Sequence, residues 1–169
     1  GTVVPELRFQ GMISNYSSSG YSSLKFLNEQ FKDDQMGTSY VNTTDAPIIR
    51  YGEVLMNYAE AAAELGTLTQ AELDKSLNVL RARAGVNLPK LEILAGQPAV
   101  NGKVYDDPNR DASVTSLLWE IRRERRAELI FEGFRLDDLK RWKKLDYADT
   151  QKNPAINTGA YVDKSKYTA

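Results

Sequence analysis

One segment, from Pro47 to Leu65, constrains the fold more than any other, because its apolar residues cover most of the circumference of a helix. At helical spacing it carries Ile49, Tyr51, Val54, Leu55, Met56, Tyr58, Ala59, Ala62, Ala63 and Leu65. A helix with so narrow a polar stripe is expected to pack on two sides. Gly52 lowers helix propensity by about 1 kcal/mol, so its expected role is to let a neighbouring helix approach closely. We predict a helix over 47–65, with Pro47 in its first turn.

A second helix is predicted after a short turn, over residues 69–84. Thr69 and Glu72 have the spacing of a capping box, in which the hydroxyl bonds forward and the carboxylate bonds back. The apolar stripe of this helix consists of Leu73, Leu77, Leu80 and Ala84. Gly66 and Gly85 end the two helices. Because so few residues join them, the helices should form an antiparallel hairpin of the size of one tetratricopeptide-type repeat.

The other segments alternate between irregular regions and helices. Residues 1–46 form an irregular, loop-rich lead-in, and residues 86–112, interrupted by prolines and glycines, form a long loop. Helices are predicted over 113–131 and 134–145, and residues 146–169 form an irregular C-terminal tail. The predicted fold class is therefore mainly α, with two α/α hairpins of tetratricopeptide-like form and long irregular loops.

Within the third predicted helix, Arg125 lies in the middle of the apolar stripe. At about 100° per residue, the residues that fall within roughly 60° of one another are Val114, Leu118, Ile121, Arg125 and Leu129. A guanidinium there must be paired, because an unpaired buried charge is very costly. The candidate partners are Glu128 and Glu132 at the edge of the stripe, and Glu53 and Glu60 on the first helix. We predict a structural Arg–Glu network that fixes the docking of the two hairpins.

Composition excludes several classes of function. The 169 residues contain no cysteine and no histidine, which removes thiolate chemistry, the commonest general base and the commonest metal ligand. The basic run from Trp119 to Leu129 is interleaved with glutamates and the net charge is −1, so no nucleic-acid partner is expected. No apolar run approaches the ~20 residues that span a bilayer.

Two acidic patterns offer a catalytic and a metal-binding alternative. Glycoside hydrolases need two carboxylates that flank a cleft, whereas the acids here sit on helix faces amid arginines. Asp106, Asp107 and Asp111 offer oxygen ligands to calcium, but they lack the spacing of an EF-hand. We therefore predict a binding module rather than an enzyme, with no catalytic residue, no metal site and no cofactor.

Several strings in the chain resemble the SusD/RagB-like family. Ile49–Ala61 is similar to the family helix "R-x-x-E-v-L-L-x-x-A-E-A", and Leu80–Val86 to the "i-R-x-R-A-G" that follows it. Ile121–Trp142 is similar to the long signature "i-r-x-E-R-r-x-E-L-x-f-E-G-x-R-x-x-D-l-x-R-W". The lead-in Ser19–Phe26 fits "G-Y-x-x-x-K-f". Because the matches keep the family's order and spacing, residues 47–145 are predicted to be a SusD-like helical core.

The resemblance implies a function that composition does not reveal. Members of this family are lipoproteins on the outer face of the outer membrane in Bacteroidetes-type bacteria. They bind glycans or other nutrients, serve polysaccharide utilization, and cap a SusC-like TonB-dependent transporter. They are not enzymes and need no redox cofactor. Family members are much longer and carry a signal peptide and a lipidated cysteine, so we expect this chain to be a C-terminal portion, with a lipid anchor only in the full-length protein.

A glycan site would combine aromatic faces with polar side chains that bind hydroxyl groups. In the predicted loops, the candidates are Tyr16, Tyr21, Tyr40, Asn42, Asn101 and Tyr105. Other aromatic residues lie on helical apolar stripes and are expected in the core, namely Tyr51, Tyr58, Trp119 and Trp142. The alternative to a glycan-binding component is a helical scaffold without a ligand, whose task is contact with the transporter or another protein.

Overall fold

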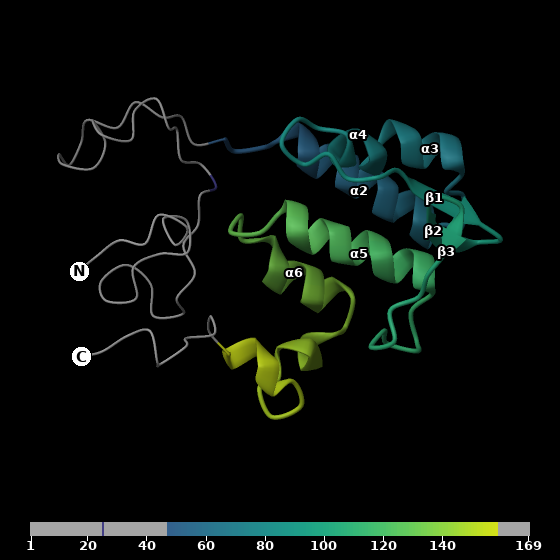
Figure 1. Ribbon diagram of the computed structural model, residues 1–169. Helices are drawn as coiled ribbons and strands as arrows, with labels where there is room; N and C mark the ends of the chain where they lie inside the picture. The colour runs from purple at the N-terminus through teal and green to yellow at the C-terminus, as the bar shows by residue number, and fades with distance from the viewer. Residues whose placement is uncertain (1–24, 26–46, 159–169) are drawn as a thin grey trace, which may run out of the picture. The chain divides into compact units, whose positions relative to one another are not determined.

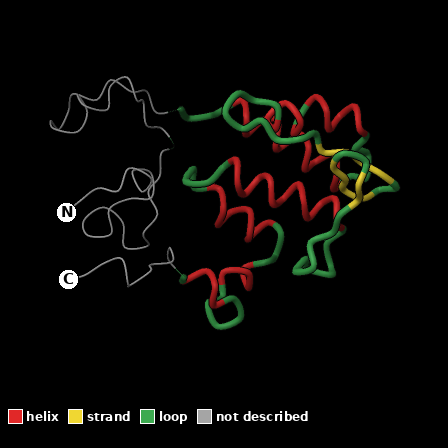
Figure 2. The backbone as a smooth tube through the Cα atoms, viewed as in Figure 1, coloured by secondary structure: helices red, strands yellow, loops and turns green. Residues whose placement is uncertain are grey.

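The structure is a computed structural model that describes Lys25 and residues 47–158 (Figure 1). The chain divides into two units. Residues 47–135 form the first, and residues 136–158 belong to the second, together with 1–46 and 159–169. The predicted irregular lead-in and the end of the predicted tail lie outside the described residues. The described part is mainly helical, which confirms the predicted fold class (Figure 2).

The elements of the first unit are α2 (Tyr51–Glu64), α3 (Gln70–Lys75), α4 (Leu77–Arg81), β1 (Leu91–Leu94), β2 (Gln97–Val100), β3 (Lys103–Val104) and α5 (Ser116–Glu128). Helix α6 (Phe134–Arg141) follows, and then two short 3-10 helices, η3 (Leu145–Ala148) and η4 (Pro154–Asn157). In the part of the chain that is described, no helix is both long enough and apolar enough to cross a membrane.

Helix α2 begins at Tyr51 rather than at Pro47, so the prediction was wrong for its first residues. Arg50 precedes the helix because its backbone is extended, with φ −107° and ψ 148°. Its guanidinium donates hydrogen bonds to Glu128 and Glu132. Helix α2 packs against α5 and against the pair α3–α4, in agreement with the predicted packing on two sides.

The predicted helix over 69–84 is instead two short helices that meet at Ser76. Ser76 is fully buried, and its hydroxyl donates to the Glu72 carbonyl at 2.7 Å. A serine that bonds back to the preceding turn competes with the regular helical ladder. Its φ of −121° and ψ of −97° are not helical, which explains the break. The predicted cap at Thr69 is present, because the Glu72 N–H donates to its Oγ1 at 3.3 Å.

Residues 91–104 form a small antiparallel sheet of order β1-β2-β3, so the prediction of an irregular loop over 86–112 was wrong for this stretch. In β1 and β2, Leu91 pairs with Val100 and Leu94 with Gln97. The turns at Ala95-Gly96 and Asn101-Gly102 place both central residues at positive φ. Such turns match the right-handed twist of hairpin strands, and an Asn-Gly pair is their strongest sequence signal.

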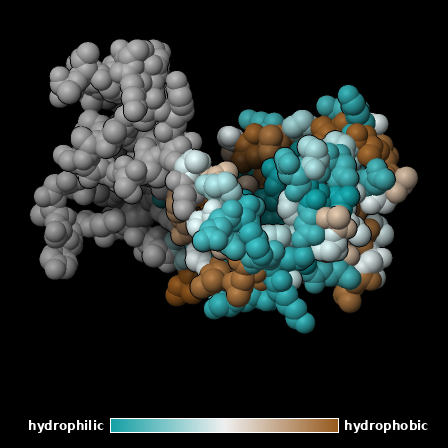
Figure 3. Space-filling view, turned by 90° about the horizontal axis from the view of Figure 1, so that it is seen from below, coloured by the Kyte–Doolittle hydropathy of each residue, from teal (hydrophilic) through white to brown (hydrophobic). Residues whose placement is uncertain are grey.

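The core of the first unit collects one or two buried side chains from each of its helices and one from β1. It consists of Met56, Ala59, Leu73, Leu77, Leu91 and Ile121. Along α2, however, Tyr51 and Tyr58 are 69% and 49% exposed, so their assignment to the core was wrong. The α5 and α3–α4 contacts cover only part of the helix and leave an apolar stripe uncovered. On the face in Figure 3, hydrophobic side chains likewise gather in separate patches amid hydrophilic ones.

The last two helices are shorter than predicted. Helix α5 begins at Ser116 rather than near 113, since Thr115 caps it by accepting a hydrogen bond from the Leu118 N–H at 3.4 Å. Helix α6 ends at Arg141, because Lys143 takes a left-handed φ of 56° that no helix continues. Trp142 is buried, as predicted, and so is Leu139, whereas Leu136 is exposed. Part of the tail that was predicted to be irregular forms η3 and η4.

Candidate functional site

The arginine predicted to point inward does so. Arg125 is 4% exposed between the buried side chains of Ile121 and Leu129 on α5. Its Nε lies 3.5 Å from Glu60 Oε2, and its Nη1 donates to Asn57 Oδ1 at 2.6 Å. Both partners are on α2, one turn apart. The guanidinium therefore pairs across the α2–α5 interface.

Glu60 is 3% exposed and lies between two arginines of α5. Besides Arg125, the Nε of Arg122 is 3.6 Å from its Oε1. Arg122 also donates to Glu64 at 2.8 Å, one turn further along α2. These contacts place two positive charges opposite two negative ones along one line of the helix pair. The cost of desolvating each charge is offset only because the partner charges are held in place.

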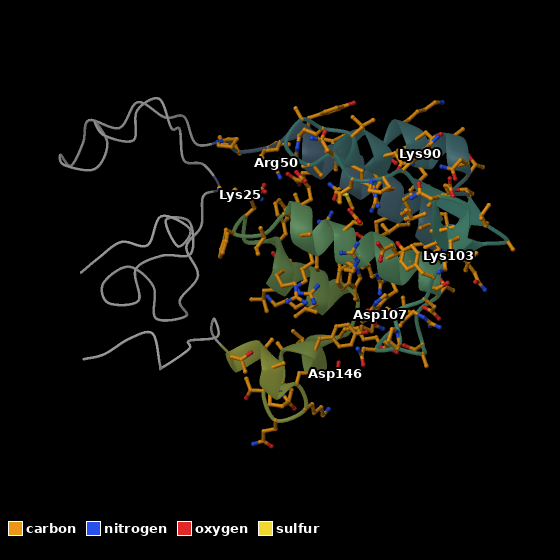
Figure 4. All side chains as sticks on the ribbon, in the orientation of Figure 1. Lys25, Arg50, Lys90, Lys103, Asp107 and Asp146 are labelled. Atoms are coloured by element: carbon orange, nitrogen blue, oxygen red, sulfur yellow. The ribbon has the colours of Figure 1, made fainter. Side chains whose placement is uncertain are left out.

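A second set of ion pairs joins the start of α2 to the end of α5. Arg50 binds the Glu132 carboxylate with two hydrogen bonds, of 2.8 and 2.6 Å. It also donates to Glu128 Oε1 at 3.0 Å and to the Glu128 carbonyl at 3.1 Å. Arg83, beyond the end of α4, binds the same Glu128 with two bonds of 3.0 Å. We call these three residue pairs, with Arg125–Glu60, the ion-pair network; Figure 4 shows Arg50 where the chain enters α2.

Within this network, Arg50 and Glu128 hold each other ionised. Hydrogen bonding to Glu132, and secondarily to Glu128, raises the pKa of Arg50 above its usual value although burial opposes it. Burial alone would raise the pKa of Glu128, but the hydrogen bonds from Arg83 and Arg50 outweigh burial and hold it below the usual range. A carboxylate fixed in this way is an ion-pair partner rather than a proton donor at neutral pH.

The structure thus distributes the predicted glutamates among different arginines. Glu60 faces Arg125, whereas Glu128 binds Arg50 and Arg83, and Glu132 binds Arg50. The two arginines Arg50 and Arg83 were not among the predicted residues. Glu53 lies half-buried in the first turn of α2. Arg50 and Arg83 both fall within the quoted family strings, and that is the signal that would have found them.

Tyr105, one of the predicted ligand residues, directly follows β3 and belongs to a further cluster of contacts with α5. Burial, and then a hydrogen bond with Glu120, raise the pKa of the Tyr105 hydroxyl well above its usual value. Glu120 is 3% exposed and accepts from Arg123 at 2.8 and 2.6 Å. The ring of Tyr105 packs against the core. Tyr105 is therefore half-buried, with its hydroxyl bound to α5.

The other predicted ligand residues are not brought together with Tyr105 by any described contact. Asn101 is exposed at the tip of the β2–β3 turn, with a φ of 51°. The remaining four, Tyr16, Tyr21, Tyr40 and Asn42, lie outside the described residues.

The aspartates before α5 are engaged with neighbouring groups. Asp106 accepts from Arg110 at 2.8 and 3.0 Å, and this bonding lowers its pKa. Asp107, labelled in Figure 4, accepts from the Asn109 N–H at 2.8 Å and from Trp119 Nε1 at 3.0 Å, and its pKa is lowered mainly by the first bond. Over residues 47–158 and Lys25, no three acidic side chains are grouped as a metal site.

The contact at Gly52 leads to a prediction about helix α2. A Cβ at this position would lie 2.8 Å from Glu128 Oε1 and 3.1 Å from Arg50 Nη1. Alanine improves helix propensity by about 1 kcal/mol. In the wild-type chain this gain should be reversed, because the new methyl group displaces a carboxylate held by two arginines. We expect Gly52→Ala to lower the free energy of unfolding by about 1 kcal/mol in urea denaturation.

The same substitution made in a Glu128→Ala background should have the opposite sign. With the carboxylate removed, Gly52→Ala should raise the free energy of unfolding by about 1 kcal/mol relative to Glu128→Ala alone. An equal effect of Gly52→Ala in both backgrounds would contradict the assigned contact.

Comparison with known proteins gives one finding. The sequence model of the SusD family matches residues 3–169, which is nearly the whole chain and extends beyond the strings that carry the resemblance. No curated protein and no solved structure matches the chain. The matched region includes every residue of the ion-pair network.

Proposed function

The chain belongs to the SusD family, and on that premise we propose that it is a nutrient-binding component of an uptake complex at the bacterial outer membrane. The nutrient we propose is a glycan or oligosaccharide, and the partner is a SusC-like TonB-dependent transporter that receives it. A lipid anchor would hold this component at the cell surface.

The observation that supports the proposal is the role of the family strings in this fold. Arg50, Arg83 and Arg125 stand in those strings, and each binds a glutamate on another element. The buried carboxylates thus serve to lock helices together, as expected of a rigid binding protein. A glycoside hydrolase would need a pair of acids with separated pKa values across a cleft.

The test is binding of the full chain to glycans. A glycan array followed by isothermal titration calorimetry should give saturable binding to at least one oligosaccharide, and chromatography should detect no cleavage of it. Absence of saturable binding to every glycan on the array would contradict the proposal.

One observation favours the alternative of a protein-contact scaffold. Tyr51, Val54 and Tyr58 of α2 and Leu65 directly after it are exposed, and they lie along one side of the helix at spacings typical of a helix–helix seam. If this stripe contacts the transporter, Val54→Asp should abolish co-purification with it and leave glycan titration unchanged. Unaltered co-purification would speak against this role of the stripe.

A further inference from the structure

A groove lies at the end of α2, where the chain turns into α3. It has a volume of about 500 Å³ and is open to solvent. Its lining residues are Tyr58, Ala61, Ala62, Leu65, Thr67, Thr69 and Glu72. A volume of this size is within the range of small-molecule sites in proteins. None of the residues predicted to bind a ligand lines it.

One wall of the groove is apolar and comes from α2. Tyr58, Ala61 and Leu65 are spaced by three and four residues, so they lie on the same side of the helix. Tyr58 is 49% exposed and Leu65 is 77% exposed. The wall therefore presents an aromatic side chain with an aliphatic residue two turns further along. An aromatic ring with a polar tip suits a ligand that has both C–H faces and hydroxyl groups.

The other wall is polar, and internal hydrogen bonds orient it. The Thr67 hydroxyl donates to the Ala62 carbonyl at 3.3 Å. The Thr69 hydroxyl donates to the Glu72 carboxylate and accepts from the Glu72 N–H at 3.3 Å. With their own hydrogens committed, the two hydroxyl oxygens have lone pairs that can accept hydrogen bonds. The carboxylate adds a stronger, charged acceptor.

We propose that this groove is a subsite for a neutral oligosaccharide, in which one sugar ring stacks on Tyr58 and donates its hydroxyl groups to Glu72 and Thr69. This assignment rests on the proposed function, because it names where a glycan binds and of which chemical class it is. The seven lining residues include one carboxylate and no cationic side chain. Uronic acids and sulfated sugars would therefore meet a like charge and bind less well.

A docked protein helix fits the polar wall less well than a sugar does. A helix laid along α2 at this point would cover Thr67, Thr69 and Glu72 with apolar side chains. Buried hydroxyl and carboxylate groups without partners are strongly unfavourable. A sugar brings its own hydroxyl groups to these acceptors, so burial of the polar wall does not leave it unsatisfied.

The experiment compares two tyrosines of the same helix. Tyr58→Ala removes the ring from the groove, whereas the control Tyr51→Ala removes an exposed ring two turns away, outside it. The full chain is titrated calorimetrically with maltohexaose, xylohexaose and mannohexaose as neutral probes, and with trigalacturonic acid as an anionic probe. Circular dichroism checks that each variant is folded.

For the neutral probe that binds best, Tyr58→Ala should raise the Kd about tenfold, whereas Tyr51→Ala should change it less than about twofold. Tyr58→Phe retains the ring and should keep the Kd within about threefold of the wild type. Glu72→Gln should weaken neutral probes and improve the relative binding of trigalacturonic acid.

Equal weakening by Tyr58→Ala and Tyr51→Ala would overturn the subsite and point to the stripe of α2 as a protein-contact surface. No weakening by Tyr58→Ala would also overturn it, while leaving glycan binding by the chain intact. If none of the four probes binds the wild-type chain, the assignment of the groove to such ligands fails, and the wider glycan array alone then decides the proposed function.

Discussion

Replacing Arg125 by methionine should lower the free energy of unfolding by about 3 kcal/mol. Methionine fills most of the volume, so the loss comes mainly from electrostatics rather than from a cavity. Glu60 is 3% exposed and would lose the guanidinium 3.5 Å from its Oε2, and Asn57 would lose its donor at 2.6 Å. Urea denaturation followed by circular dichroism measures the change.

Two further variants separate this effect from a general loss of charge. Arg126→Met removes the next arginine, which is exposed, and should change the stability by less than about 0.5 kcal/mol. The double variant Arg125→Met with Glu60→Met removes both buried charges and should recover to within about 1 kcal/mol of the wild type, since Arg122 keeps Glu64. Purely additive losses in the double variant would show that Arg125 and Glu60 do not interact.

The inward position of Arg125 could be predicted because the phase of a helix follows from its sequence alone. The choice of its partner could not. Glu128 and Glu132, three and seven residues further along the chain, and the glutamates of α2 are equally compatible with the sequence. Which of them pairs depends on how the helices cross and on where Arg50, in extended backbone before α2, directs its side chain.

The small sheet and the exposed stripe were missed for different reasons. Strands of four and two residues are too short to show alternation, and only the Asn101-Gly102 turn marks a hairpin. The apolar residues of α2 occupy most of its circumference, so periodicity shows that the helix is apolar but not which part a neighbour covers. Tyr51 and Tyr58 lie on the part that the first unit leaves open.

Because neither the small sheet nor the exposed stripe of α2 was predicted, the candidate ligand residues were chosen from loops. Tyr105 lies in a predicted loop, yet the sheet turns its ring toward the core and its hydroxyl toward Glu120. Tyr58 lies on a predicted core stripe, yet it lines an open groove. In this fold the ion-pair network makes α2 a rigid support, and a ligand surface on such a helix needs no ordering on binding.

Replacing Asn78 by alanine should lower the free energy of unfolding by about 3 kcal/mol. Asn78 is 7% exposed. Its side-chain amide makes the two hydrogen bonds to the Leu91 backbone that a neighbouring strand would otherwise make. Its Nδ2 donates to the Leu91 carbonyl and its Oδ1 accepts from the Leu91 N–H, each at 2.8 Å. Leu91 is fully buried at the start of β1, so alanine would leave its N–H without an acceptor.

Hydrogen exchange tests the mechanism as well as the size of this effect. The Leu91 amide should lose much of its protection in Asn78→Ala beyond the change in global stability. The Ile93 amide should follow global stability, because it donates to Gln70 Oε1 at 2.8 Å. Asn109→Ala, at an exposed asparagine, should change neither amide and serves as the control. Persistent protection at Leu91 would mean that another group accepts this bond, and that the edge of β1 does not depend on Asn78.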